Sequence, residues 1–139
     1  MSLPGWVQTF EFDSGGPVAF SPYGRWKVRL DREGHLALKH EQYYGEGGKY
    51  TDYGSFALPS GGTKLWRLVD AVDIPNLQSS TRMQVPDEGA YTLTLSGQGN
   101  QVSRSIWRGD ALGNPQIDAL IEKLTRVIEE VTGVRPVLR

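Results

Sequence analysis

The sequence predicts an α+β fold, a twisted antiparallel sheet of about six strands (order β-β-β-β-α-β-β-α) with two helices packed on one face. Three observations support this fold class. Several short segments alternate apolar and polar residues, which is the period of a strand with one buried face. Two longer segments carry apolar residues at the helical period. Seventeen glycines and eight prolines supply many turns, and strands joined by hairpin turns pair antiparallel. With 139 residues, we expect residues 1–139 to form a single domain.

The first strands are predicted from alternation near the N-terminus. Residues 6–12 place Phe10 and Phe12 on one face, and a Gly-Gly-Pro turn follows this strand. Residues 24–44 form the clearest hairpin, because apolar residues share one face of its first strand and basic residues share the other. Gly34 supplies the positive φ that the tight turn of this hairpin requires.

A segment rich in tyrosine and glycine follows. Residues 41–54 hold four tyrosines, four glycines and no aliphatic side chain. We expect Gly47 and Gly48 to form the tip of a second hairpin. Residues 50–56 then form the fourth strand.

The first helix is predicted over about residues 62–73. Its apolar residues recur at intervals of three and four, as one stripe of a helix does (Leu65, Leu68, Val69 and Val72). Ser60 or Thr63 is the expected cap, and Pro75 forces an end by Ile74.

A third hairpin and a second helix complete the predicted fold. Residues 91–95 and 102–108 alternate as strands on either side of a turn at 97–100. The second helix covers about residues 115–132. Asn114 is its expected N-cap, Pro115 its first residue, and Gly133 the residue after its end.

The composition argues against several classes of function. Fifteen basic and sixteen acidic residues give a formal net charge of −1, so the chain lacks the positive charge of a typical nucleic-acid-binding domain. The absence of cysteine removes disulfides, thiolate ligands and cysteine nucleophiles. No stretch of about 18 apolar residues predicts a membrane span. The first residues show no signal peptide, so we expect a cytoplasmic protein unless a leader was removed.

Residues 12–17, FDSGGP, are similar to the sequence around the nucleophilic serine of chymotrypsin-like proteases. Those enzymes carry a histidine and an aspartate before the serine in the chain, and no histidine precedes Ser14. We therefore predict a turn and no catalysis here. On this interpretation Ser14→Ala leaves the fold nearly intact, whereas bulky residues at Gly15 or Gly16 do not.

Other catalytic and metal patterns are also missing. His35 and His40, the two histidines of the chain, are five residues apart, so on a strand they face opposite sides. We expect one exposed histidine and one near the core, and no metal site. Glu11 and Asp13 have the spacing of an acid–base pair on one strand face, but such carboxylates are more often a solvated face. No phosphate-binding loop pattern is present. We expect no enzyme activity and no cofactor.

Two surfaces are candidates for binding a partner. The tyrosines of the Tyr/Gly segment, Tyr43, Tyr44, Tyr50 and Tyr53, are suited to anchor a protein contact; the alternative is packing within the sheet. A basic sheet face is the second candidate, with Arg25, Lys27, Arg29 and Lys39 at its centre and Arg104 and Arg108 added to it. This face would bind an acidic partner, RNA or a small molecule, or it is a solvated outer face.

Three segments together resemble the emfourin family, small bacterial protein inhibitors of thermolysin-like (protealysin-type) metalloproteases. They are SGGPVAF (14–20), ALPSGGTKLWRLVDAVDIPNL (57–77), and PDEGAYTLTLSGQGNQVSRSIW (86–107) with the helix that follows. The resemblance extends from about residue 6 to 131. Residues 23–56 depart from it, because they form a longer block with an added Tyr/Gly hairpin. In this respect the chain resembles small bacterial domains of unknown function.

The resemblance implies a protein partner and no catalysis, with Ser14, Gly15, Gly16 and Pro17 as part of a contacting loop. We therefore predict a non-enzymatic protein-binding domain that inhibits a thermolysin-like metalloprotease. The alternatives are binding of a small molecule or nucleic acid through the basic face, or another function of a bacterial domain.

Overall fold

A computed structural model of the chain describes residues 3–15, 24–44, 47–83 and 89–138. Six strands form one antiparallel sheet in the order β4-β3-β2-β1-β5-β6. The strands are β1 (Thr9–Asp13), β2 (Arg25–Asp31), β3 (His35–Tyr44), β4 (Gly47–Ala57), β5 (Ala90–Gly97) and β6 (Asn100–Trp107). The predicted α+β class and the six-stranded antiparallel sheet are confirmed.

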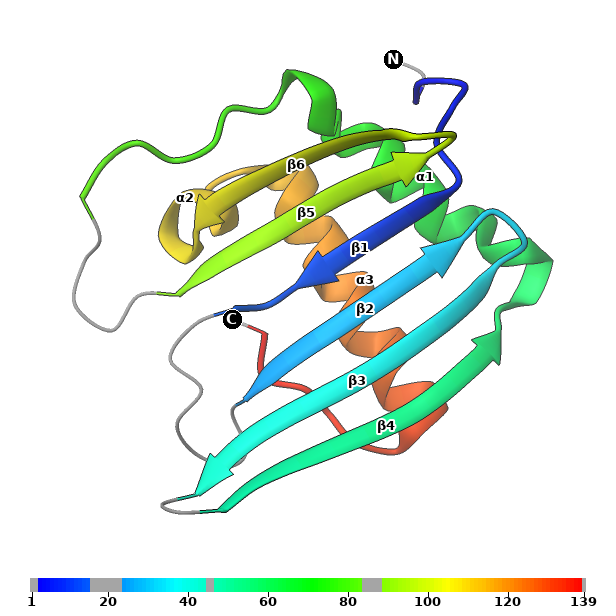
Figure 1. The fold of residues 1–139 in the computed structure, drawn as a ribbon, viewed down its shortest axis with the longest axis vertical. Coiled ribbons are helices and arrows are strands. Elements are labelled where there is room, and N and C mark those ends of the chain that lie inside the picture. The colour runs from blue at the N-terminus through cyan, green and yellow to red at the C-terminus, as the bar shows by residue number, and fades with distance from the viewer. Residues whose placement is uncertain (1–2, 16–23, 45–46, 84–88, 139) are drawn as a thin grey trace.

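The strand order places β1 at the centre of the sheet. On one side β1 pairs with β2, from which β3 and β4 follow as successive hairpins. On the other side β1 pairs with β5, and β5 pairs with β6 (Figure 1). The five residues of β1 therefore join two groups of strands that are far apart in the sequence.

Helices cover one face of this sheet. The long helices α1 (Thr63–Val72) and α3 (Pro115–Thr132) pack against each other and cross behind the strands, while the short helix α2 (Arg108–Leu112) follows β6 directly (Figure 1). Both predicted long helices are present within a residue of their expected bounds. Helix α2 is additional, and it begins where the strand 102–108 was expected to end.

The alternation that predicted the strands is also what builds the core. Residues facing the helices are buried, including Phe10 and Phe12 of β1 and Trp26, Val28 and Leu30 of β2. They meet the apolar stripes of the two long helices, Leu65, Val69 and Val72 from α1 and Ile117, Leu120, Ile121, Leu124, Val127 and Ile128 from α3. The opposite face of the sheet is covered by no described element.

Two local expectations are corrected. Gly47 and Gly48 begin β4 and pair with Tyr44 and Tyr43 of β3, so they are strand residues and not the hairpin tip. Neither Ser60 nor Thr63 caps α1. Its N-cap is Gly62, with φ of 72°, and no side chain bonds there; the Thr63 hydroxyl instead donates to the Ser60 carbonyl at 2.6 Å.

Two segments without regular structure complete the sheet and its core. Residues 79–82 cover the free edge of β6, where the Ser80 N–H donates to the Ser105 carbonyl and the Ser79 hydroxyl accepts from the Ser105 N–H. After α3, the chain returns to the sheet and buries Leu138, whose carbonyl accepts a hydrogen bond from the Tyr91 hydroxyl. Within the described ranges, no helix is both long and apolar enough to span a membrane.

Candidate functional site

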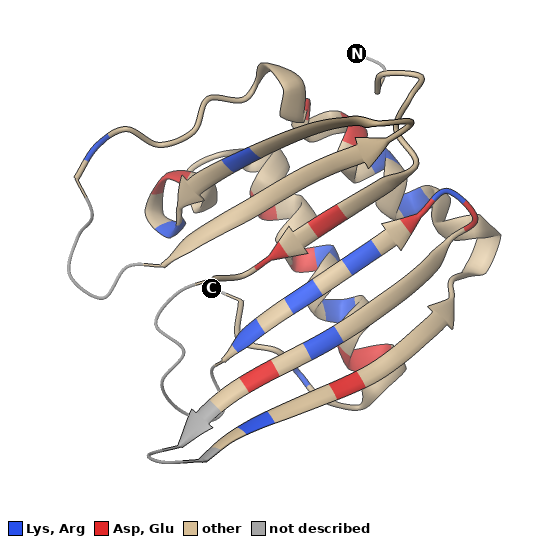
Figure 2. Ribbon diagram, viewed as in Figure 1, with Lys and Arg blue, Asp and Glu red and all other residues tan. Residues whose placement is uncertain are grey.

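The uncovered face of the sheet carries most of the predicted basic residues. Because side chains alternate along each strand, Arg25, Lys27 and Arg29 of β2 and Lys39 of β3 all lie on this open face. Acidic residues occupy the same face in comparable number, namely Glu11, Asp13, Asp31, Glu41 and Asp52. Charges of both signs lie over β1 to β4 (Figure 2). The expected basic face is therefore a mixed one, because the neighbouring strands supply carboxylates that the β2 pattern alone does not show.

Ion pairs cross the strands of the open face. The Arg25 guanidinium donates two hydrogen bonds to the Asp13 carboxylate, from Nε to Oδ1 at 2.8 Å and from Nη2 to Oδ2 at 2.5 Å. Lys27 lies 3.3 Å from Glu41, and Arg29 lies 3.8 Å from Glu11. The bidentate Arg25–Asp13 pair fixes the end of β1 against the start of β2.

In each of these pairs the cation is more exposed than its carboxylate. The exposed side-chain fractions are 65% for Arg29 against 49% for Glu11, and 42% for Lys27 against 20% for Glu41. Within the described part of the chain, Lys39 is exposed and forms no ion pair. A molecule approaching these three pairs and Lys39 therefore meets ammonium and guanidinium groups before the paired carboxylates.

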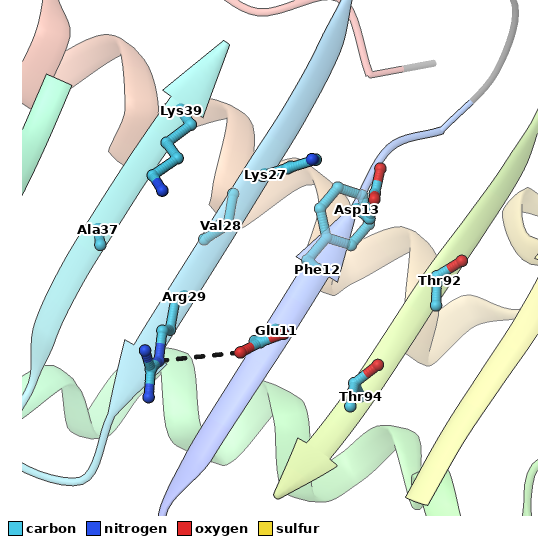
Figure 3. Close-up of a pocket in the computed structure, with 10 residues that line it drawn as sticks. All are labelled: Glu11, Phe12, Asp13, Lys27, Val28, Arg29, Ala37, Lys39, Thr92 and Thr94. Atoms are coloured by element: carbon cyan, nitrogen blue, oxygen red, sulfur yellow. Dashed lines mark ion pairs between the residues drawn. The ribbon is translucent and has the colours of Figure 1, made fainter. Parts of the chain in front are cut away.

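A shallow depression of about 470 Å³ lies at the centre of the open face. Its charged lining consists of Lys27, Arg29, Lys39, Glu11 and Asp13, so cations outnumber carboxylates by three to two. Figure 3 shows these side chains around the depression, with Thr92 and Thr94 on the β5 side and Ala37 on the β3 side. The small side chain of Ala37 and the short threonines leave the space that longer residues would fill.

Two arginines predicted to extend the basic face lie elsewhere. Arg104 is opposite the core residue Leu93, so it points to the helix side. Its guanidinium donates to the Leu77 carbonyl at 2.7 Å and to the Pro75 carbonyl at 3.1 Å. Arg108 lies in α2, with its guanidinium 5.6 Å from the ring centre of Tyr91. Both arginines therefore have structural contacts, and the prediction that they join the open face is wrong.

The described part of the Gly-Gly-Pro element is structural. Ser14 is only 2% exposed, and its hydroxyl accepts a hydrogen bond from the Trp26 N–H at 2.8 Å. Its side chain is therefore not available to a partner or to a substrate. Gly15 has φ of 54°, and a Cβ there would lie 2.1 Å from the Ala90 carbonyl oxygen. Gly16 and Pro17 lie outside the described residues.

The tyrosines of the Tyr/Gly segment divide between two environments. Tyr50 is 56% exposed and lies opposite Glu41, which places it on the open face at the sheet edge. Tyr53 stacks on Trp26 with ring centres 5.7 Å apart, so it belongs to the core side. The strands reach Tyr43 and Tyr44, but the side chains of these two residues lie outside the described part.

The histidines face opposite sides, as their spacing predicted. His40 is buried and stacks on Trp26 with ring centres 4.1 Å apart. His35 is exposed, and its Nδ1 lies 3.3 Å from Asp31 and 3.6 Å from Glu33. Among the described residues, Asp31, Glu33 and His35 form a group whose possible ligand atoms lie within 4.8 Å of one another. The sequence interpretation missed this group, because it compared the histidines with each other and not with nearby carboxylates.

Asp31 organises the turn between β2 and β3. Its Oδ1 accepts hydrogen bonds from the backbone N–H groups of Glu33 and His35, at 2.9 and 3.0 Å. Partial burial raises the pKa of the Asp31 carboxyl. The two backbone hydrogen bonds and the neighbouring His35 ring outweigh that effect and hold the pKa below its ordinary value of 3.8. The close approach of these three residues is thus explained by the turn itself.

Fold and site together define the class of domain: an α+β domain whose sheet has one face buried under helices and one open, charged face with a central depression. No model of a known protein family matches the chain, and no curated protein matches it either.

Proposed function

We propose that this chain is a non-enzymatic protein-binding domain that uses the open sheet face to bind an acidic part of another protein. The observation that carries the proposal is the charge of the central depression. Three cations and two carboxylates line it, and Lys39 has no described carboxylate partner. A carboxylate of a partner would complete this set of charges.

The arrangement of the ion pairs supports a protein partner. The pairs hold the long side chains of Arg25, Lys27 and Arg29 in place across the strands, which lowers the entropy lost when a partner orders them. A flat sheet face with a shallow depression suits a broad contact better than the enclosure of a small ligand. The exposed Tyr50 at the edge adds an aromatic group of the kind that anchors protein contacts.

The class of partner follows from the sequence resemblance to emfourins, and we propose a thermolysin-like metalloprotease. The mixed charge of the open face gives less support to nucleic-acid binding. A phosphate backbone requires an excess of cations along an extended surface. Here cations exceed carboxylates only in the lining of the central depression, and over the whole face five acidic residues accompany four basic ones.

The test measures binding and inhibition with thermolysin and related proteases. Wild-type protein is expected to bind, to slow hydrolysis of a peptide substrate, and to bind more weakly as salt rises. Lys39→Glu is expected to weaken binding by about tenfold or more, because it places a carboxylate against the acidic partner. Lys64→Glu is the matched control, since it makes the same charge change at an exposed residue of α1 on the other layer.

Two results would overturn the proposal in part or as a whole. Binding without a difference between Lys39→Glu and Lys64→Glu would remove the open face as the binding surface. No binding or inhibition with any protease of this class would remove the proposed partner. A salt-dependent RNA complex that Lys39→Glu abolishes would favour the nucleic-acid alternative instead.

A further inference from the structure

A second surface cavity, shallow and open to solvent, lies at the end of the sheet, away from the open face. It has a volume of about 460 Å³ and is formed between the N-terminal segment, the β2–β3 turn and helix α1. Two arginines line it, Arg32 from the turn and Arg67 from the helix, together with Trp66 and Asp70. It shares no lining residue with the central depression, so the inference below does not depend on the proposed protein-binding function.

The guanidinium of Arg32 is held in place from two sides. Its Nε donates to the Val7 carbonyl at 3.0 Å, and its plane lies over the indole of Trp66 with 4.4 Å to the ring centre. Trp66 is itself fixed, because its indole N–H donates to the Asp31 carbonyl at 2.9 Å. Among the described groups, the two terminal nitrogens of Arg32 have no hydrogen-bond acceptor. A pre-positioned guanidinium with free N–H groups is suited to a bidentate contact with an oxyanion.

Arg67 is exposed, and in the described structure its side chain makes no ion pair and no hydrogen bond. Among the described residues, five other arginines pair with carboxylates: Arg25, Arg29, Arg82, Arg126 and Arg135. Asp70 lines the same cavity but forms no ion pair with Arg67 or Arg32 in the described structure. Two guanidinium groups against one carboxylate leave one positive charge uncompensated.

We infer that this cavity is a binding site for a small oxyanion, a phosphate or carboxylate group held between the guanidinium groups of Arg32 and Arg67. Arg32 supplies the fixed donors. Arg67, on its flexible side chain, closes on the bound anion. The Asp70 carboxylate repels an anion that extends along the helix toward it, so the site favours a compact oxyanion.

The test follows the arginine Nε–H and tryptophan Nε1–H signals by NMR while the anion is added. Sodium phosphate and sodium acetate are titrated separately, each against sodium chloride at matched ionic strength and pH, so that the two arms tell phosphate from carboxylate. Saturable shifts at Arg32, Arg67 and Trp66 are expected in at least one arm. Shifts that match the chloride series, or that never saturate, would overturn the inference.

Variants assign the effect to the two arginines. Arg67→Gln and Arg32→Lys are each expected to weaken binding of the anion by about tenfold. The first removes a positive charge, and the second keeps the charge but removes the planar set of N–H donors that a guanidinium provides. Arg126→Gln, which removes an exposed arginine from α3, is the matched control and is expected to bind as wild type does. Equal binding by Arg67→Gln and Arg126→Gln would overturn the inference. A backbone amide spectrum of each variant confirms that it is folded.

Discussion

At the residue scale, the end of β1 is held by hydrogen bonds to the first residues of its partner strand β2, including those made by the side chains of Asp13 and Ser14. Ser14 accepts the Trp26 N–H through its side chain, and it donates its own N–H to the Trp26 carbonyl at 3.0 Å. Asp13 accepts from Gly15 and from Arg25. Asp13, Ser14 and Gly15 therefore fix the chain where it leaves the sheet. These contacts explain the polar sequence at this position without a catalytic role.

We expect Ser14→Ala to destabilise the protein by about 1–3 kcal/mol, because the buried Trp26 N–H would lose its acceptor. This replaces the expectation that the substitution is nearly neutral. Urea unfolding measures the change in the free energy of unfolding. Ser55→Ala, at an exposed position of β4, is the control and should stay within about 0.5 kcal/mol of wild type. Equal midpoints for the two variants would contradict the role assigned to the Ser14 hydroxyl.

Asp31 gives a pH dependence at the same scale. Its native pKa is lowered, so its charged form stabilises the fold. That contribution is complete at pH values above 3.8, the ordinary pKa, and is lost as the pH falls through the lower native pKa. A carbon-13 titration of the Asp31 carboxyl should give a midpoint below 3.8, and Asp31→Asn should remove this part of the acid sensitivity. A midpoint at or above that value would show that the turn N–H groups do not stabilise the carboxylate.

At the scale of elements, strong local patterns predicted the structure well. Helix α3 has an N-cap whose side chain accepts from two backbone N–H groups, a proline at its start and a glycine with φ of 75° at its end, and each of these is visible in the sequence. Helix α1 was found from its apolar stripe, but its cap was not. The N-cap is Gly62, where a Cβ would lie 3.3 Å from the Gly34 Cα in the β2–β3 turn. A contact between residues so far apart in the sequence leaves no local pattern.

The tail after α3 was missed for the same reason. Leu138 follows a glycine and a proline, with no period to mark it, yet it is 2% exposed and its carbonyl accepts from Tyr91. We expect Leu138→Ala to destabilise the protein by about 2–4 kcal/mol, because the substitution leaves a cavity in the core. Val134→Ala, at an exposed position of the same tail, is the control. Thermal unfolding of both variants measures the difference, and a midpoint for Leu138→Ala equal to that of the control would show that the tail does not contribute to the core.

At the scale of the whole molecule, the fold could be predicted more completely than the site. Alternation identifies which residues lie on the open face, and all four expected residues, Arg25, Lys27, Arg29 and Lys39, lie there. Their charge environment depends on which strands become neighbours. The pairing of β1 with β2 brings Glu11 and Asp13 beside the arginines, and strand order is not encoded in any local period.

The central position of β1 also bears on how the chain reaches its native state. Strands β2, β3 and β4 form hairpins along the chain, as do β5 and β6, but β1 joins β5 across 87 residues between Thr9 and Ser96. Closing so long a loop has an entropic cost that is incurred before the contacts form, so we expect this pairing to limit the folding rate.

A single cross-link tests this expectation. The hydroxyl oxygens of Thr9 and Ser96 lie 2.9 Å apart, and the chain has no cysteine, so Thr9→Cys with Ser96→Cys would form one defined disulfide. The oxidised protein should be more stable than its own reduced form by up to about 4 kcal/mol, and stopped-flow refolding should be faster. Unchanged refolding kinetics on oxidation would place the slow step elsewhere. The shortest strand of the sheet, β1, would then set the rate at which strands β2 to β4 and strands β5 and β6 are joined into one sheet.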